Sequence, residues 1–206
     1  MTNKKTSIAV FVSGGGTNLQ ALIDAEKSGI IKNGRIGLVI SSSPTAYAIT
    51  RANNTNIPVV VVSKKECGSQ ECFEERIKSA LKERGIELIV LAGFMSILSA
   101  DFTNEYPERI INVHPSLIPS FCGKGFYGLR VHEAALEYGV KVTGATVHFV
   151  NEIPDGGKII LQKSVNIRKN DTAETLQKRV MQQAEWIILP KAVELVSKDI
   201  SKSKKG

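Results

Sequence analysis

Residues 8–18 read Ile-Ala-Val-Phe-Val-Ser-Gly-Gly-Gly-Thr-Asn, an apolar run that passes directly into a glycine-rich turn. The β-branched and aromatic residues of 8–12 predict a buried strand, and the helical spacing that begins near Leu19 predicts a helix after the turn. A strand that enters a helix through a short glycine turn is the first unit of many open α/β sheets. We therefore expect an α/β fold that begins at this point.

Short apolar runs rich in β-branched residues continue to alternate with stretches of helical spacing. The apolar runs lie at 36–40, 59–62, 88–91 and 110–113, and the helical stretches lie near 19–26, 46–53 and 72–83. Strands that are apolar on both faces and alternate with helices are typical of a parallel sheet. The pattern predicts a doubly wound α/β fold, with a mostly parallel sheet and helices on both faces.

The pattern changes after a predicted helix near 129–138. Two longer extended runs follow, at 141–150 and 158–167, and residues 151–157 join them. Their length and short connection predict an antiparallel C-terminal strand pair added to the sheet.

The last part of the chain combines an amphipathic stretch with lysines. A helix is predicted from about 172 to 196, with Asp171 as its N-cap. The side chains expected to face the body are Leu176, Val180, Ile187 and Ile188. Residues 196–206 hold four of the lysines behind the formal charge of +7, and we expect a flexible basic tail there. At this length, residues 1–206 are expected to form a single domain.

The composition restricts the partners. No apolar stretch reaches the roughly 20 residues of a membrane span, and the N-terminal run is too short for a secretory signal. We therefore expect a cytoplasmic protein that does not bind a membrane. The basic residues lack the aromatic interleaving of nucleic-acid surfaces, so small anionic partners are expected instead. The three cysteines lack the paired spacing of zinc ribbons, and neither a metal nor a disulfide is expected.

The glycine-rich loop Ser13-Gly14-Gly15-Gly16-Thr17-Asn18 is the first chemical motif. Exposed backbone N–H groups and the helix dipole favour a phosphate at such a helix start, and glycines let the backbone approach it closely. The loop is not a Walker A motif, because no Lys-Ser or Lys-Thr pair follows. Two interpretations stay open here, a phosphate-binding loop and a tight turn between strand and helix.

The second motif, Asn112-Val113-His114-Pro115, ends the fifth predicted strand. Asn112 and His114 are spaced two apart and share one face, so both should point to the crevice at the carboxyl ends of the strands. An amide N–H₂ and an imidazolium can both donate to an oxyanion, which suits acyl transfer. A histidine bonded only to a backbone carbonyl is the alternative.

The third motif is Asp155-Gly156-Gly157, between the two long extended runs. By itself it predicts a turn. A carboxylate brought near His114 would raise the pKa of that histidine and accept a proton from an attacking amine.

Four motifs occur in a fixed order. They are Ser-Gly-Gly-Gly-Thr-Asn-Leu-Gln at 13–20, Leu-Ala-Gly-Phe-Met at 91–95, Asn-Val-His-Pro-Ser-Leu at 112–117 and Gly-Ala-Thr-Val-His-Phe-Val at 144–150, the last followed by Asp155-Gly156-Gly157. In this order they resemble the folate-dependent phosphoribosylglycinamide formyltransferase family, from about Ser7 to Val196. The resemblance implies the formyltransferase fold.

The resemblance also implies an activity. The co-substrate 10-formyltetrahydrofolate would give its formyl group to the amine of glycinamide ribonucleotide, in de novo purine biosynthesis, without a metal. The implied catalytic residues are His114 as general acid–base and oxyanion partner, Asn112 as second oxyanion donor, and Asp155 as the group that raises the pKa of the histidine. The enzyme would act as a monomer or homodimer on small molecules.

The resemblance further implies two binding sets. The ribonucleotide set is Gly14, Gly15, Gly16, Thr17 and Asn18 at the phosphate, with Glu185 at the ribose; the folate set is Met95, Ser96, Ile97, Leu98 and Asn112. Without the resemblance, Glu185 reads as a solvated helix carboxylate and residues 95–98 as core. The bond between Ile118 and Pro119 is the expected cis peptide.

Alternative functions remain for this sequence. A formyltetrahydrofolate hydrolase and a methionyl-tRNA formyltransferase share the same three catalytic residues, but they carry an extra N-terminal domain or C-terminal barrel that we do not expect here. A non-catalytic nucleotide-binding module would explain the glycine-rich loop and leave Asn112, His114 and Asp155 without a role.

Overall fold

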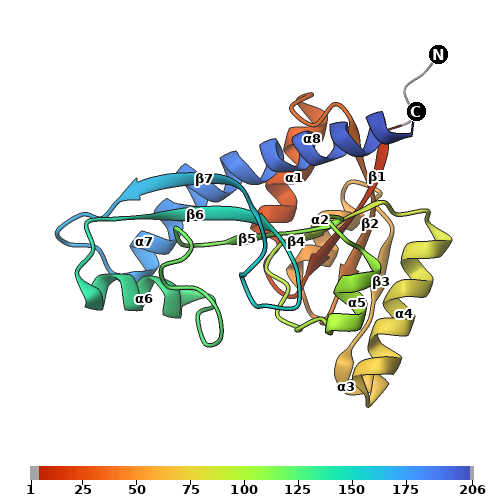
Figure 1. The fold of residues 1–206 in the computed structure, drawn as a ribbon, viewed down its shortest axis with the longest axis horizontal. Coiled ribbons are helices and arrows are strands. Elements are labelled where there is room, and N and C mark those ends of the chain that lie inside the picture. Colours follow the sequence, from red (N-terminus) through yellow and green to blue (C-terminus); the bar gives the residue numbers. More distant parts are fainter. Residues whose placement is uncertain (1–4, 205–206) are drawn as a thin grey trace.

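The computed structural model describes residues 5–204, whose strands form one seven-stranded sheet in the order β3-β2-β1-β4-β5-β6-β7 (Figure 1). The strands are β1 (Thr6–Val12), β2 (Gly34–Ser41), β3 (Val59–Val61), β4 (Leu88–Leu91), β5 (Ile110–His114), β6 (Val142–Phe149) and β7 (Ile159–Asn166). Strands β1 to β5 pair in parallel, and β6 runs antiparallel to both β5 and β7. The predicted fold class is confirmed.

Helices cover both faces of the sheet (Figure 1). They are α1 (Thr17–Lys27), α2 (Tyr47–Asn53), α3 (Lys64–Cys67), α4 (Gln70–Glu83), α5 (Ala100–Glu105), α6 (Leu129–Tyr138), α7 (Ala173–Val180), a π-helical turn η1 (Met181–Glu185) and α8 (Trp186–Ser203). Val10 of β1 packs in the core layer under α1 and α8, and its neighbour Phe11 packs in the opposite layer under α4 and α5. Adjacent strand residues face opposite sides, so β1 supplies both layers.

The start of α7 differs from the prediction. Thr172, not Asp171, is the N-cap: its hydroxyl accepts from the Thr175 amide, and the Thr175 hydroxyl accepts from the Thr172 amide. Asp171 instead forms an ion pair with Arg179. The reciprocal threonine pair satisfies two backbone donors at the helix start, which is the capping-box arrangement.

The predicted continuous final helix is interrupted by η1. A π-helical turn holds more residues per turn than an α-helix, so it rotates the faces of α8 relative to those of α7. Ile188 is buried as predicted, but Ile187 is 38% exposed, and the prediction that it faces the body is wrong.

The predicted flexible tail is also wrong over much of its length. Helix α8 continues to Ser203 because Val196 and Ile200 extend its buried face, and Lys204 forms an ion pair with Glu87. Residues 205 and 206 lie outside the described residues. None of the helices between residues 5 and 204 has the length and apolar character to cross a membrane.

Candidate active site

All residues predicted for the site line one cavity of about 1020 Å³ at the carboxyl ends of β1, β4 and β5. Its lining includes the ribonucleotide set, the folate set and the three predicted catalytic residues. These are Gly14, Gly15, Gly16, Thr17, Asn18 and Glu185; Met95, Ser96, Ile97 and Leu98; and Asn112, His114 and Asp155. Ligands of open α/β sheets bind at this edge, and the volume lies at the upper end of the range for small-molecule sites.

The glycine-rich loop offers a row of backbone donors. The N–H groups of residues 14–18 donate to no acceptor among residues 5–204. The carbonyl oxygens of Gly14, Gly15 and Gly16, in contrast, all accept hydrogen bonds from the protein. In a trans peptide the N–H points opposite to the preceding carbonyl, so the N–H groups of residues 15–17 point away from the partners of these carbonyls, and all three residues line the cavity.

Glu185 is a buried carboxyl beside this loop. Its Oε2 accepts a hydrogen bond of 2.7 Å from Asn18 Nδ2. Burial raises the pKa of Glu185 to about 7, although the hydrogen bond from Asn18 acts in the opposite direction. The alternative of a solvated helix carboxylate does not fit a side chain that is only 6% exposed.

The stretch 95–98 forms an exposed wall of the cavity. Met95 is 57% and Ile97 is 77% exposed, so the alternative that these residues are plain core is wrong for both. The Met95 amide donates to the Ser13 hydroxyl at 2.8 Å, which ties this wall to the glycine-rich loop. Exposed apolar side chains on a cavity wall suit a flat ring.

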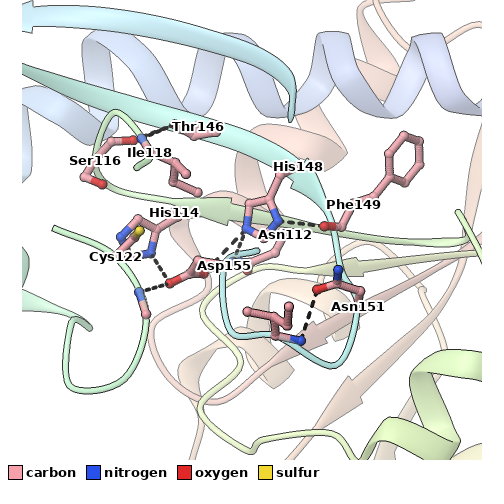
Figure 2. Close-up of polar contacts among 12 residues, drawn as sticks. Asn112, His114, Ser116, Ile118, Cys122, Thr146, His148, Phe149, Asn151 and Asp155 are labelled. Atoms are coloured by element: carbon pink, nitrogen blue, oxygen red, sulfur yellow. Dashed lines mark hydrogen bonds and ion pairs between the residues drawn. The ribbon is translucent and has the colours of Figure 1, made fainter. Parts of the chain in front are cut away.

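Asp155 joins the other two predicted catalytic residues (Figure 2). Its Oδ2 lies 3.4 Å from His114 Nδ1, and its Oδ1 lies 3.5 Å from Asn112 Nδ2. Oδ2 also accepts a hydrogen bond of 2.8 Å from the Gly123 amide. The segments that follow β5 and β6 therefore meet at one carboxylate.

The turn that carries Asp155 requires its glycine at 157. A Cβ atom on Gly157 would overlap the carbonyl oxygen of Phe149, so a larger residue there would push the turn away from β6. Asp155 itself has a φ of 56°, in the left-handed region that aspartate tolerates better than most residues. The predicted turn thus aims the carboxylate into the cavity.

Both ring nitrogens of His114 face oxygen atoms. Nε2 lies 2.8 Å from the Phe121 carbonyl oxygen, to which it donates, while Nδ1 faces Asp155. The pKa of His114 is nevertheless lowered, because burial outweighs the charge of Asp155 and the carbonyl of Phe121, which both raise it. Asp155 thus acts in the expected direction, but the net pKa falls because the side chain is nearly inaccessible to water.

The carboxylate responds in a complementary way. Burial raises the pKa of Asp155, but the neighbouring His148 ring, the charge of His114 and the Gly123 amide together bring that pKa below its usual value. At neutral pH the site therefore holds an ionised Asp155 beside a largely neutral His114.

Two histidines of the cavity wall were not predicted. His148 Nε2 lies 3.2 Å from Asn112 Nδ2 and 3.5 Å from Asp155 Oδ1. His132 on α6 is fully buried, neither of its nitrogens has a hydrogen-bond partner within residues 5–204, and burial lowers its pKa to about 4. His148 is brought to the site by the antiparallel register that pairs it with Asn112, which the sequence alone does not give.

The loop after β5 carries the expected cis bond between Ile118 and Pro119. The Ile118 amide donates to the hydroxyl of Thr146 on β6 at 3.1 Å (Figure 2). Within residues 5–204, no group of three or more His, Cys, Asp or Glu side chains is arranged to hold a metal ion.

The family model for formyl transferases matches residues 6–193, nearly the whole chain. The chain therefore belongs to the formyl transferase family, as the four motifs indicated. Within this family, proteins named phosphoribosylglycinamide formyltransferase are similar to most of the chain. Phosphoribosylglycinamide formyltransferase of Haemophilus influenzae is 42% identical over 183 residues, which cover 89% of this chain and 83% of that protein.

Two further comparisons agree. The trifunctional purine biosynthetic protein adenosine-3 of Gallus gallus is 42% identical over 193 residues, and this chain covers only 18% of its length. Glycinamide ribonucleotide transformylase 1 from Symbiobacterium toebii has a similar structure, with a TM-score of 0.89 at 37% identity, over 97% of this chain and 90% of that one.

Proposed function

We propose that this chain transfers the formyl group of 10-formyltetrahydrofolate to the amine of glycinamide ribonucleotide, giving formylglycinamide ribonucleotide and tetrahydrofolate. The proposal includes residues 1–206 as one formyltransferase domain that acts in the cytoplasm. The observation that carries it is Asp155, which lies within 3.5 Å of both Asn112 and His114 in a cavity that also contains the glycine-rich loop.

In the proposed reaction the amine nitrogen attacks the formyl carbon, and the formyl oxygen becomes an oxyanion. Asn112 Nδ2 donates to this oxygen in place of its long 3.5 Å contact with Asp155 Oδ1, and the Nε2–H of His114 turns to it from the Phe121 carbonyl oxygen, so both stabilise its charge. The low pKa of Asp155 keeps its carboxylate ionised beside His114. The pair takes the proton that the amine loses and returns it to N10 of the folate as the bond from carbon to N10 breaks.

The proposed ligand positions follow the two ends of the cavity. The phosphate of the ribonucleotide binds the N–H groups of residues 14–18, and Glu185 accepts from the ribose hydroxyls. The folate ring lies against Met95, Ile97 and Leu98, which leaves Asn112 and His114 between the two substrates. This arrangement brings the amine and formyl carbon together, which is a large part of any bimolecular acceleration.

A direct assay separates this function from its alternatives. The protein is incubated with 10-formyltetrahydrofolate, with and without glycinamide ribonucleotide, and tetrahydrofolate release is followed. Release that requires the ribonucleotide supports the proposed transfer. Release without it identifies a hydrolase, and no release under either condition favours a binding module.

A further inference from the structure

We infer that Arg51 is a positioning residue that holds the glycine-rich loop in its anion-binding conformation. Arg51 belongs to α2 and is not part of the cavity wall. Its Nε donates to the Gly15 carbonyl oxygen at 2.8 Å, and its Nη1 donates to Gln20 Oε1 at 3.1 Å. The inference rests on the proposed ribonucleotide site and adds a residue that contacts the loop from the α2 side, outside the cavity lining.

The direction of the loop's peptide groups gives Arg51 its effect. The Gly14 carbonyl accepts from the Ala48 amide at 3.1 Å, so two successive carbonyls of the loop are held toward α2. Because a trans peptide is planar, fixing the Gly15 carbonyl toward α2 turns the Gly16 N–H away from α2. Arg51 therefore determines where one of the phosphate donors points.

The loop packs closely against α2 at Gly16. A Cβ atom on Gly16 would lie 2.6 Å from the Cβ of Ala48 and 3.4 Å from Cδ of Arg51, and Gly16 has a φ of 70°. The loop thus rests directly on α2 and on the stem of the arginine. A shift of the arginine would be transmitted to the loop through contact as well as through the hydrogen bond.

An arginine fits this place better than a lysine. Its planar fork joins the loop at Gly15 to the first helix at Gln20, and its Cζ lies 5.1 Å from the centre of the Tyr47 ring. A planar group that stacks flat on an aromatic ring and holds its donors in a rigid fork is a property that an ammonium group lacks. The fixed positive charge behind the loop also favours a dianionic phosphate on the other side.

The test compares Arg51→Met and Arg51→Lys with the wild type in the transfer assay. Arg51→Met should raise the KM for glycinamide ribonucleotide by about tenfold, the size expected for one charged hydrogen bond, while kcat and the KM for the folate stay within about twofold. Arg51→Lys keeps the positive charge but not the planar guanidinium, so its KM for glycinamide ribonucleotide should lie between those of the wild type and Arg51→Met. Competitive inhibition by inorganic phosphate should weaken in the same order.

Arg35→Met is the matched control, since Arg35 is an exposed cation at the start of β2, at the end of that strand away from the carboxyl ends that form the cavity. It should leave all constants unchanged. Equal KM values in wild type and both Arg51 variants would overturn the inference, and so would a parallel fall in kcat and in affinity for both substrates. An inactive wild type would instead reject the proposed function, which separates the two failures. If Arg51→Met does not fold, the Arg51→Lys comparison decides alone.

Discussion

His148 Nε2 lies 3.2 Å from the side-chain nitrogen Nδ2 of Asn112, because the two residues are directly opposite in the antiparallel pair of β5 and β6. The other ring nitrogen of His148 donates to the Phe149 carbonyl oxygen at 2.7 Å. In the neutral ring the proton is therefore on Nδ1, and Nε2 accepts from Asn112. The strand pairing thus fixes the direction of the Asn112 amide.

If His148 acts through Asn112, their substitutions should not add. His148→Phe should lower kcat by about tenfold, because the amide of Asn112 loses the acceptor that orients it. In the background of Asn112→Ala, His148→Phe should have little further effect. A double-mutant cycle on kcat measures this coupling, and fully additive losses would contradict the assigned relationship.

Asp155→Asn should lower kcat by at least about tenfold and leave the affinity for the ribonucleotide nearly unchanged, because it removes a proton acceptor and not a phosphate contact. The asparagine oxygen can still accept from the Gly123 amide, so the turn should keep its position. Steady-state kinetics with both substrates varied gives the two constants.

Asp101→Asn serves as the control for Asp155→Asn, since Asp101 is an exposed carboxylate in the first turn of α5. It should leave kcat unchanged. Wild-type turnover in Asp155→Asn would remove this carboxylate from the proposed mechanism.

The sheet and the shared face of Asn112 and His114 were predictable because both follow from local sequence, whereas Glu185 and residues 95–98 were assigned to the site only through the resemblance. Alternation of apolar runs and helical spacing placed β1 to β5, and a two-residue spacing was enough to direct Asn112 and His114 to one side. The turn at Asp155 was also local, although its approach to His114 was expected from the resemblance and not from the turn itself.

What escaped prediction depends on tertiary contacts. Whether Ile187 faces the core depends on η1, and a π-helical turn has no simple sequence signal. The direction of the His114 pKa depends on how deeply the ring is buried, which a sequence does not reveal. His148 gained its place through strand register, and the basic tail continued as helix because Ile200 packs on the body.

The two middle glycines of the loop should respond differently to substitution. A Cβ atom on Gly15 meets nothing within 4 Å, so Gly15→Val should fold and should weaken ribonucleotide binding more than folate binding, as its side chain crowds the ligand. Gly16→Ala forces a Cβ onto Ala48 at a φ of 70°, and it should cost about 1–3 kcal/mol of stability. Thermal unfolding and titration with each substrate distinguish the two, and equal losses of both ligands in Gly15→Val would contradict the assignment.

The buried carboxyl of Glu185 should make stability depend on pH. Its pKa of about 7 lies above the ordinary 4.5, so the folded protein favours the protonated form. The resulting stabilisation is complete below pH 4.5 and is lost as pH rises toward 7, by an amount on the order of 3 kcal/mol. Glu185→Gln keeps the neutral shape at every pH, so its free energy of unfolding relative to wild type should rise across this window.

Urea unfolding of both proteins at pH 4.5, 6 and 7.5 measures that difference, and the titration of His132 cancels because both proteins contain it. The hydrogen bond from Asn18 lowers the pKa of Glu185, so Asn18→Leu should move the window to higher pH. A difference between Glu185→Gln and wild type that stays constant with pH would mean that Glu185 is ionised in the folded protein. The buried carboxylate would then need a cation or further donors that its only side-chain partner, Asn18, does not supply within residues 5–204.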